Sequence, residues 1–177
     1  MRFIPMEVEG AWIVQPERLE DERGWFARAF CSAEFKAHGL ETRWVQANVS
    51  LSRSAYTLRG LHYQKPPHEE AKLVRCLRGR LWDVVADLRP GSPTFGRWAA
   101  VELTPDNLQW VYVPKGCAHG FLTLEPDSEA FYLVSSAYAP QAEAGVRWDD
   151  PLFSIQWPAE PRVLSVKDQS WPRFQSA

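Results

Sequence analysis

Two histidines, an arginine and a lysine stand beside strand-like segments in the middle of the chain. Arg59 lies three residues before His62, and Lys72 follows ten residues after it. His119 ends a Pro-Lys-Gly-Cys-Ala-His run further along. A neutral imidazole can take a proton from carbon, and nearby cations can hold the negative charge that results. These residue types predict proton abstraction beside a carbonyl group, provided that they meet in one pocket.

A histidine base also needs a partner for its second ring nitrogen, and an aspartate there would fix the tautomer. Asp83, in a strand-like run, and Asp168, near the C-terminus, are both candidates, and the residues leave the choice open. A phenol can return a proton to an enolate as a general acid. Tyr132 and Tyr138 are the candidates for that role.

The PxGxxH spacing that ends at His119 resembles the second motif of cupin barrels. The first cupin motif normally supplies HxH as metal ligands, but here Gln64 stands in place of the second histidine. His68, Glu69 and Glu70 follow in a Pro-Pro-His-Glu-Glu loop, which is better suited to solvent than to a site. Two histidines and a glutamine are a poor ligand set for zinc or iron. We therefore expect no metal and no other cofactor, so that the side chains carry the chemistry.

Size and composition narrow the classes of function. A chain of 177 residues is most simply one domain over residues 1–177, and it can bury a sizeable core. The net charge of -2 argues against a nucleic-acid partner. No apolar run approaches the roughly 18 residues of a membrane span. The three cysteines form no CxxC pair, which favours free thiols in the cytoplasm, and Cys117 is expected to be buried and inert.

The regular spacing of turn-forming residues along the chain predicts an all-β fold. Proline and glycine recur about every ten residues, between short runs rich in Val, Leu, Trp, Tyr and Phe. One segment looks helical, over residues 33–38, with Ser32 as its cap and Gly39 at its end. From Asp149 onward, the prolines indicate an irregular C-terminal part that wraps a barrel.

Residues 81–89 show the two-residue period of a strand. Asp83 and Asp87 share one face, while the other face is apolar. The face with two aspartates is solvent in a typical sheet, but it can line a polar cavity in a barrel that opens to a ligand. Strict alternation also puts Arg59 and His62 on opposite faces. If both serve one pocket, a bulge or a strand end must intervene.

Taken together, the chain resembles the dTDP-4-dehydrorhamnose 3,5-epimerase family over nearly its whole length. The matching runs are Asp21-Glu-Arg-Gly-Trp-Phe26, Gln46-Ala-Asn48-Val-Ser50, Leu58-Arg-Gly-Leu-His-Tyr-Gln64, Lys72-Leu-Val, Asp83-Val-Val-Ala-Asp-Leu-Arg89, Gly91-Ser-Pro-Thr-Phe-Gly96, Ala118-His-Gly-Phe121, Trp148-Asp-Asp-Pro151 and Ile155-Gln-Trp-Pro158. The resemblance implies a metal-free, cupin-type jelly-roll barrel with a few short peripheral helices. It also implies a homodimer with exchanged N-terminal strands.

The resemblance implies a cofactor-independent isomerase that acts on a nucleotide-linked 4-keto-6-deoxyhexose, in the setting of rhamnose biosynthesis. His62 would remove the proton beside the ketone, with Asp168 as its partner. Lys72 would stabilise the enolate oxygen, and Tyr132 would return a proton from the opposite face. The substrate-binding positions of the family fall on Arg23, Phe26, Gln46, Asn48, Arg59, His119, Tyr138, Glu143 and Lys167.

Two positions depart from the family pattern. Arg28 stands where the family usually has a glutamate, in the nucleotide site, so the identity of the substrate's nucleobase is open. Cys117 stands where a phenylalanine is common. The motifs do not separate inversion at C3, at C5 or at both, nor dTDP-4-dehydrorhamnose formation from related reactions. A catalytically silent sugar-nucleotide-binding barrel and a metal-dependent cupin enzyme are the alternatives from other classes.

Overall fold

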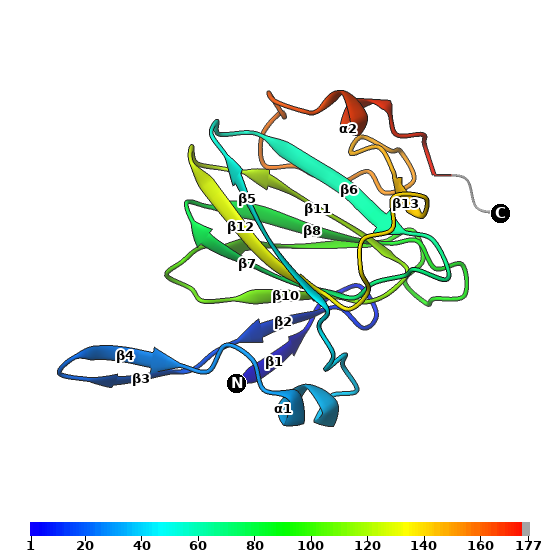
Figure 1. Cartoon of the computed structure of the whole chain (residues 1–177). Helices are drawn as coiled ribbons and strands as arrows, with labels where there is room; N and C mark the ends of the chain where they lie inside the picture. Colours follow the sequence, from blue (N-terminus) through cyan, green and yellow to red (C-terminus); the bar gives the residue numbers. More distant parts are fainter. Residues whose placement is uncertain (175–177) are drawn as a thin grey trace.

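Two antiparallel sheets face each other in the computed structural model, which describes residues 1–174 (Figure 1). One sheet has the strand order β1 (Arg2–Pro5), β2 (Trp12–Gln15), β10 (Trp110–Val113), β7 (Lys72–Arg78), β12 (Ser128–Val134) and β5 (Gln46–Ser52). The other has the order β13 (Glu143–Gly145), β6 (Leu58–Gln64), β11 (Cys117–Thr123), β8 (Leu81–Asp87) and β9 (Trp98–Leu103). The predicted all-β, cupin-type barrel is confirmed. Residues 175–177, the end of the domain expected over 1–177, lie outside the described part.

A third, two-stranded element projects from the barrel near the N-terminus. Strands β3 (Arg18–Asp21) and β4 (Gly24–Ala27) form a hairpin that extends away from the two sheets (Figure 1). All of its residues except Ala27 are exposed. The hairpin therefore contributes almost nothing to the core of its own chain.

Two short helices lie at the periphery. Helix α1 (Ser32–Ala37) begins one residue earlier than predicted, because the Phe35 N–H already bonds to the carbonyl oxygen of Cys31. Ser32 is therefore not the cap. The helix also ends one residue earlier than predicted, at Ala37, but the left-handed turn predicted at Gly39 is confirmed, with a φ of 70°. Helix α2 (Val166–Ser170) is capped by Ser165, whose hydroxyl accepts a hydrogen bond from the Asp168 N–H.

Strand β8 shows how alternation divides the molecule into layers. Val84 and Ala86 face outward into an apolar cluster, and Leu81 and Val85 face inward. Each fully buried Val or Leu contributes about 1.5–3 kcal/mol, so both faces stabilise the sheet. The face that carries Asp83 is therefore interior, as expected for a barrel that holds a polar cavity.

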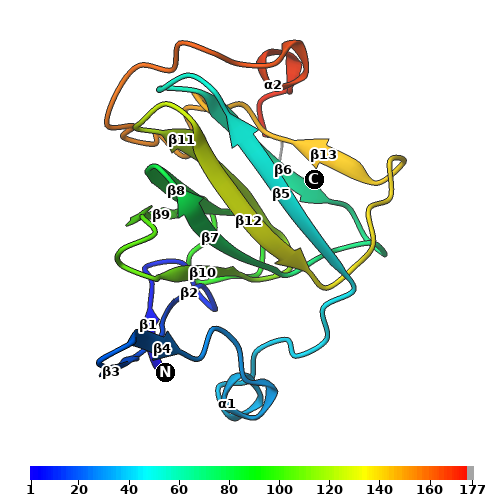
Figure 2. The ribbon, with the colours of Figure 1, turned by 60° about the vertical axis from the view of Figure 1, so that its left-hand side comes forward.

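The C-terminal part wraps the outer side of the five-stranded sheet, as predicted (Figures 1 and 2). Phe153, Ile155 and Phe174 cover this face of the sheet. Asp150 is almost fully buried and accepts a hydrogen bond from the Phe174 N–H at 2.6 Å. These contacts hold α2 over β6. Within residues 1–174, no helix has the length and apolar character to cross a membrane.

A register shift between β6 and β11 brings Arg59 and His62 to the same side. His62 pairs with His119, while Arg59 pairs with Phe121, so β6 carries one extra residue. The shift includes Gly60, where an added Cβ would lie 2.6 Å from the Cα of Gly120. Of the two possibilities that the sequence left open, a bulge and a strand end, the structure has the bulge.

Candidate active site

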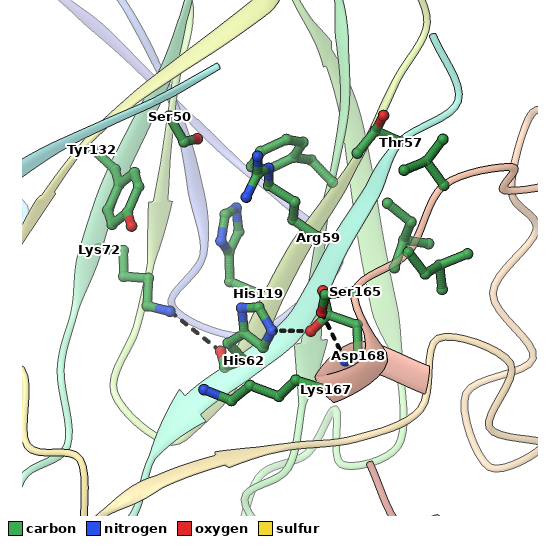
Figure 3. Close-up of a pocket in the computed structure, with 14 residues that line it drawn as sticks. Ser50, Thr57, Arg59, His62, Lys72, His119, Tyr132, Ser165, Lys167 and Asp168 are labelled. Atoms are coloured by element: carbon green, nitrogen blue, oxygen red, sulfur yellow. Dashed lines mark hydrogen bonds and ion pairs between the residues drawn. The ribbon is translucent and has the colours of Figure 1, made fainter. Parts of the chain in front are cut away.

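A cavity of about 440 Å³ lies between the two sheets, with residues of α2 and the segment before it along one side (Figure 3). It has side chains from three sources. The six-stranded sheet contributes Ser50, Lys72 and Tyr132, the five-stranded sheet contributes Arg59, His62, His119 and Phe121, and the C-terminal segment contributes Ser165, Lys167 and Asp168. The volume is in the range of small-molecule sites. All four residues that the sequence predicted for one pocket, Arg59, His62, Lys72 and His119, meet in it.

His62 and Asp168 form a hydrogen-bonded pair at one side of the cavity. The Nε2 atom of His62 lies 2.5 Å from the Oδ1 atom of Asp168, which is 4% exposed (Figure 3). Burial raises the pKa of this carboxyl group, but its interactions with His62, Ser165 and Trp171 outweigh that effect and lower the pKa overall. Asp168 is therefore a carboxylate at neutral pH.

The pairing sets the tautomer of the neutral His62 ring. A carboxylate only accepts hydrogen bonds, so Nε2 carries the proton and donates it to Asp168. The Nδ1 atom is then the basic nitrogen. This arrangement lets His62 take a proton while Asp168 stabilises the resulting imidazolium.

Lys72 is held by a buried acid that the sequence did not predict for the site. Its Nζ atom lies 3.2 Å from the Oε1 atom of Glu70 and donates to the carbonyl oxygen of His62 at 3.2 Å. The Gln64 amide donates to the other carboxylate oxygen of Glu70 at 2.9 Å. The expectation that Glu70 faces solvent was wrong: its side chain is 10% exposed. A buried partner for the ammonium is the physical reason.

Tyr132 reaches the same cavity from the opposite sheet (Figure 3). Burial raises the pKa of its phenol, the negative charge of Glu70 raises it further, and Arg59 opposes this in part. The phenol therefore keeps its proton throughout the neutral range. Tyr132 is thus available as a proton donor, whereas Tyr138 is more than half exposed and donates to Glu143.

His119 and Arg59 are fixed by contacts within the barrel. The Nε2 atom of His119 lies 2.9 and 3.0 Å from the two carboxylate oxygens of Asp83, which is fully buried. Arg59 donates from Nε to Ser52 Oγ at 3.0 Å and from Nη2 to the carbonyl oxygen of Leu51. Of the two aspartates that the sequence left open, Asp168 contacts His62 and Asp83 contacts His119.

A second cavity of about 300 Å³ adjoins the first and shares His62, Lys72 and Tyr132 with it. Four predicted substrate-binding residues line it, namely Gln46, Asn48, Tyr138 and Glu143. Glu143 also forms an ion pair with Lys167 of α2. The two cavities therefore adjoin at the three residues that they share.

Two predicted substrate-binding residues lie outside both cavities. Arg23 and Phe26 belong to the projecting β3–β4 hairpin, and Arg23 pairs with Asp21 of the same turn. Phe26 is 64% exposed. Within one chain, the structure does not bring them together with the other predicted residues.

The histidines and aspartates of the site, which could in principle bind a metal, form hydrogen bonds with one another. Each of the two cavity histidines pairs with an aspartate, and residues 1–174 contain no group of three or more His, Cys, Asp or Glu side chains arranged to hold a metal ion. Burial raises the pKa of the Cys117 thiol to about 12, so this thiol is not a nucleophile at neutral pH.

Three residues of the site gave no clear signal in the sequence. Ser50 lines the main cavity, and its buried hydroxyl has no hydrogen-bond partner within residues 1–174. Ser165 caps α2, and a Ser-Val-Lys-Asp run could have indicated this role. Trp171 donates from Nε1 to Asp168 Oδ1 at 3.2 Å, a contact that only the path of the chain reveals.

Comparison with known proteins agrees with this geometry. The model of the family described as dTDP-4-dehydrorhamnose 3,5-epimerase matches residues 5–176. A dTDP-4-dehydrorhamnose 3,5-epimerase from Methanothermobacter thermautotrophicus is 42% identical over 173 residues, which cover 96% of this chain and 92% of the relative.

Solved structures extend the likeness to the whole barrel. The dTDP-4-dehydrorhamnose 3,5-epimerase of Elizabethkingia anophelis superposes with a TM-score of 0.95 at 40% identity and covers 98% of this chain and 96% of its own. ChmJ, a 3'-monoepimerase from Streptomyces bikiniensis in complex with dTDP-quinovose, gives a TM-score of 0.87 at 39% identity, with 96% and 86% covered. The chain belongs to the dTDP-4-dehydrorhamnose 3,5-epimerase family.

Proposed function

We propose that the protein epimerises a nucleotide-linked 4-keto-6-deoxyhexose by proton removal and return beside the ketone. One observation carries the proposal: the imidazole of His62 and the phenol of Tyr132 line one cavity from opposite sheets, with the ammonium of Lys72 in the same space. A base and an acid on opposite sides of a sugar ring are what inversion of a carbon centre requires.

The first step breaks a C–H bond. The Nδ1 atom of His62 takes the proton from the carbon beside the ketone, and the electron pair of that bond forms an enolate. The imidazolium is stabilised by Asp168, to which Nε2 donates. The ammonium of Lys72, held by Glu70, lowers the energy of the enolate oxygen.

The second step restores the C–H bond on the other face. The phenol of Tyr132 donates its proton to the carbon, and the enolate electrons return to form the ketone. The raised pKa of Tyr132 keeps this proton in place until the enolate has formed. The protein regains its starting state by exchanging protons with water, so each turnover carries solvent hydrogen into the product.

The proposed substrate is dTDP-4-dehydro-6-deoxyglucose, which inversion at C3 and C5 converts to dTDP-4-dehydrorhamnose. The family model, and the dTDP sugar held by ChmJ, support this assignment. Arg59 and His119 would contact the diphosphate or the sugar, and Gln46 and Asn48 would contact the nucleotide. The hydroxyl of Ser50, which has no hydrogen-bond partner in the described part of the chain, would supply one more polar group for the ligand.

The protein is further proposed to act as a cytoplasmic homodimer with exchanged N-terminal strands. The projecting hairpin exposes Leu19, Trp25 and Phe26, and the edge strand β5 exposes Val49 on its outer face. Apolar side chains at this density on a projecting element favour a protein partner. In such a dimer, Arg23 and Phe26 would reach the site of the other copy. Free cysteines fit a reducing compartment.

Proton NMR in deuterated water tests the reaction directly. The protein is offered dTDP-, CDP- and GDP-linked 4-keto-6-deoxy sugars side by side, and loss of the C3 and C5 proton signals is followed in each. We expect both signals of the dTDP sugar to disappear as the epimerised product forms. Exchange at a single carbon would identify a mono-epimerase. A faster reaction with the CDP- or GDP-linked sugar would show that the substrate carries that nucleotide and not dTDP.

Two results of the same experiment would remove the proposal. Binding of every sugar nucleotide without any exchange would make the protein a silent binding barrel. Exchange that disappears after treatment with a chelator and returns with added metal would make it a metal-dependent cupin enzyme. Sedimentation of the protein, with a Trp25→Asp variant as the comparison, tests the dimer independently.

A further inference from the structure

Trp171 contacts the His62–Asp168 pair from the outside of the barrel. Its Nε1 atom donates to the Oδ1 atom of Asp168 at 3.2 Å, the same oxygen that accepts from His62. Its ring also meets the ring of His62 edge to face, with centroids 6.1 Å apart. One indole therefore touches both members of the pair.

Gly145 provides the space in which this indole lies. Gly145 is paired with His62 in the register of β13 and β6. A Cβ added to Gly145 would lie 2.4–2.6 Å from three atoms of the Trp171 indole, Cε2, Cδ2 and Nε1, which are its nearest neighbours. Such distances are too short for any real contact, so only glycine allows the ring to lie against β13 beside His62.

Further contacts fix the segment on either side of Trp171. The Arg147 N–H donates to the carbonyl oxygen of Pro172, and the Lys167 ammonium lies 5.5 Å from the centroid of the indole. Helix α2 has only five residues, too few to hold Asp168 in place by itself. The orientation of Asp168 thus depends on contacts from outside the helix.

We propose that Trp171, lying against Gly145, is a positioning residue that orients Asp168 and, through it, the base His62. Because its N–H and His62 donate to the same carboxylate oxygen, the indole fixes where that oxygen lies relative to the imidazole. Trp171 does not touch the proposed substrate. Its catalytic effect rests on the proposed function, but its effect on the His62–Asp168 hydrogen bond does not.

The Trp171→Phe variant removes the N–H donor and keeps a ring in the same place. One hydrogen bond to a charged group, such as the Asp168 carboxylate, corresponds to about a tenfold to hundredfold change in rate when it is lost from the transition state. We expect kcat to fall by this factor with KM unchanged. Trp157→Phe is the matched control: its indole N–H donates to the Trp148 carbonyl oxygen at 3.0 Å, away from the cavity, and kcat should not change.

A double-mutant cycle isolates the contact with Gly145. Gly145→Ala should lower kcat more than Trp171→Phe does, because the new methyl group displaces the whole indole. In a Trp171→Ala background, the same Gly145→Ala change should have no further effect, since nothing remains for the methyl group to strike. Equal losses in both backgrounds would overturn the assignment of Gly145 as the space for Trp171.

Nitrogen-15 NMR of the histidine side chains gives a readout that needs no substrate. The chain has four histidines, and the Nε2–H of His119, bonded to Asp83, serves as an internal reference. In Trp171→Phe, we expect the Nε2–H of His62 to exchange faster with water while that of His119 keeps its rate.

The two readouts separate the proposals. A wild-type protein that exchanges no sugar proton removes the proposed function, yet the NMR signal still tests the positioning role. An unchanged His62 signal together with an unchanged kcat in Trp171→Phe would overturn that role. If Trp171→Phe does not fold, Gly145→Ala supplies the same two measurements.

Discussion

The cavity contains two histidine–aspartate pairs that are alike in chemistry and different in how they are built. His119 and Asp83 come from neighbouring strands of one sheet, and the aspartate is fully buried. His62 stands opposite His119 in the register, but its aspartate comes from a short helix 106 residues away in the sequence. One pair is part of the barrel, and the other is completed by a segment that wraps it.

This structural difference suggests different roles for the two pairs, one in binding and stability and the other in the chemical step. A pair within a sheet has little freedom, so the ring of His119 is held in a fixed position at the cavity wall. The imidazole of His62 is about one-third exposed, as a base proposed to meet a reacting carbon has to be, and its partner is held by Ser165 and Trp171. Disturbing the first pair should therefore affect the fold and binding, and disturbing the second should affect the chemical step.

Replacing each histidine by glutamine tests whether the two pairs differ in function, and the largest effect is expected here, for His62→Gln. His62→Gln keeps a donor for Asp168 but has no basic nitrogen, so kcat and the rate of solvent exchange should both fall by about 10²–10⁴. His119→Gln keeps a donor for Asp83, so kcat should stay within a few-fold while KM rises. Steady-state kinetics and exchange NMR measure both. Full retention of exchange in His62→Gln would contradict its role as the base.

Asparagine replacements apply the same change to each aspartate. Asp168→Asn should lower kcat by about 10²-fold, because the amide can hold the wrong tautomer of His62. Asp83→Asn should leave kcat within a few-fold and lower the free energy of unfolding by about 1–3 kcal/mol, since it disturbs a fully buried hydrogen-bonded acceptor. Urea unfolding and initial rates distinguish the two. Similar kinetic losses in both variants would remove the distinction.

The part of the site that lies on strands could be predicted from the sequence. Alternation along residues 81–87 separated the aspartates from the apolar face. The spacing of Arg59 and His62 required a bulge or a strand end, and β6 has a bulge. Such patterns work because side-chain direction in a strand depends only on the neighbouring residues.

Contacts made by irregular segments could not be predicted in the same way. Glu70 follows two prolines in a loop, and nothing local shows that Lys72 and Gln64 will bury it. The choice between Asp83 and Asp168 depended on the path of the C-terminal segment, and the contact of Trp171 with Gly145 joins residues with no shared pattern. Family resemblance indicated Asp168, whereas local chemistry did not.

A third carboxylate, Asp87, extends the comparison to stability alone. Burial raises its pKa, but hydrogen bonds from Arg89, Ser92 and Thr94 outweigh this and lower the pKa to about 2 from 3.8. Because the pKa of Asp87 is lower in the folded state, its ionisation stabilises the fold by roughly 2 kcal/mol at any pH well above the unfolded-state pKa. This contribution disappears as the pH falls toward 2. The difference in unfolding free energy between wild type and Asp87→Asn should be constant above pH 5 and shrink below pH 4. A pH-independent difference would contradict the charge pairing.

The smallest expected effect concerns the acid on the other side of the cavity. The negative charge of Glu70 helps to raise the pKa of Tyr132, so Glu70→Gln should lower that pKa. Because the phenol donates only while it is protonated, the alkaline limb of the pH profile of kcat should move to lower pH, by less than about one unit. Glu69→Gln, the same change one residue away, is the control and should leave the limb in place. A limb that moves equally in both variants would show a general charge effect. A shift only in Glu70→Gln would show that the loop residue Glu70 sets the pKa of Tyr132, much as the C-terminal segment is proposed to orient His62.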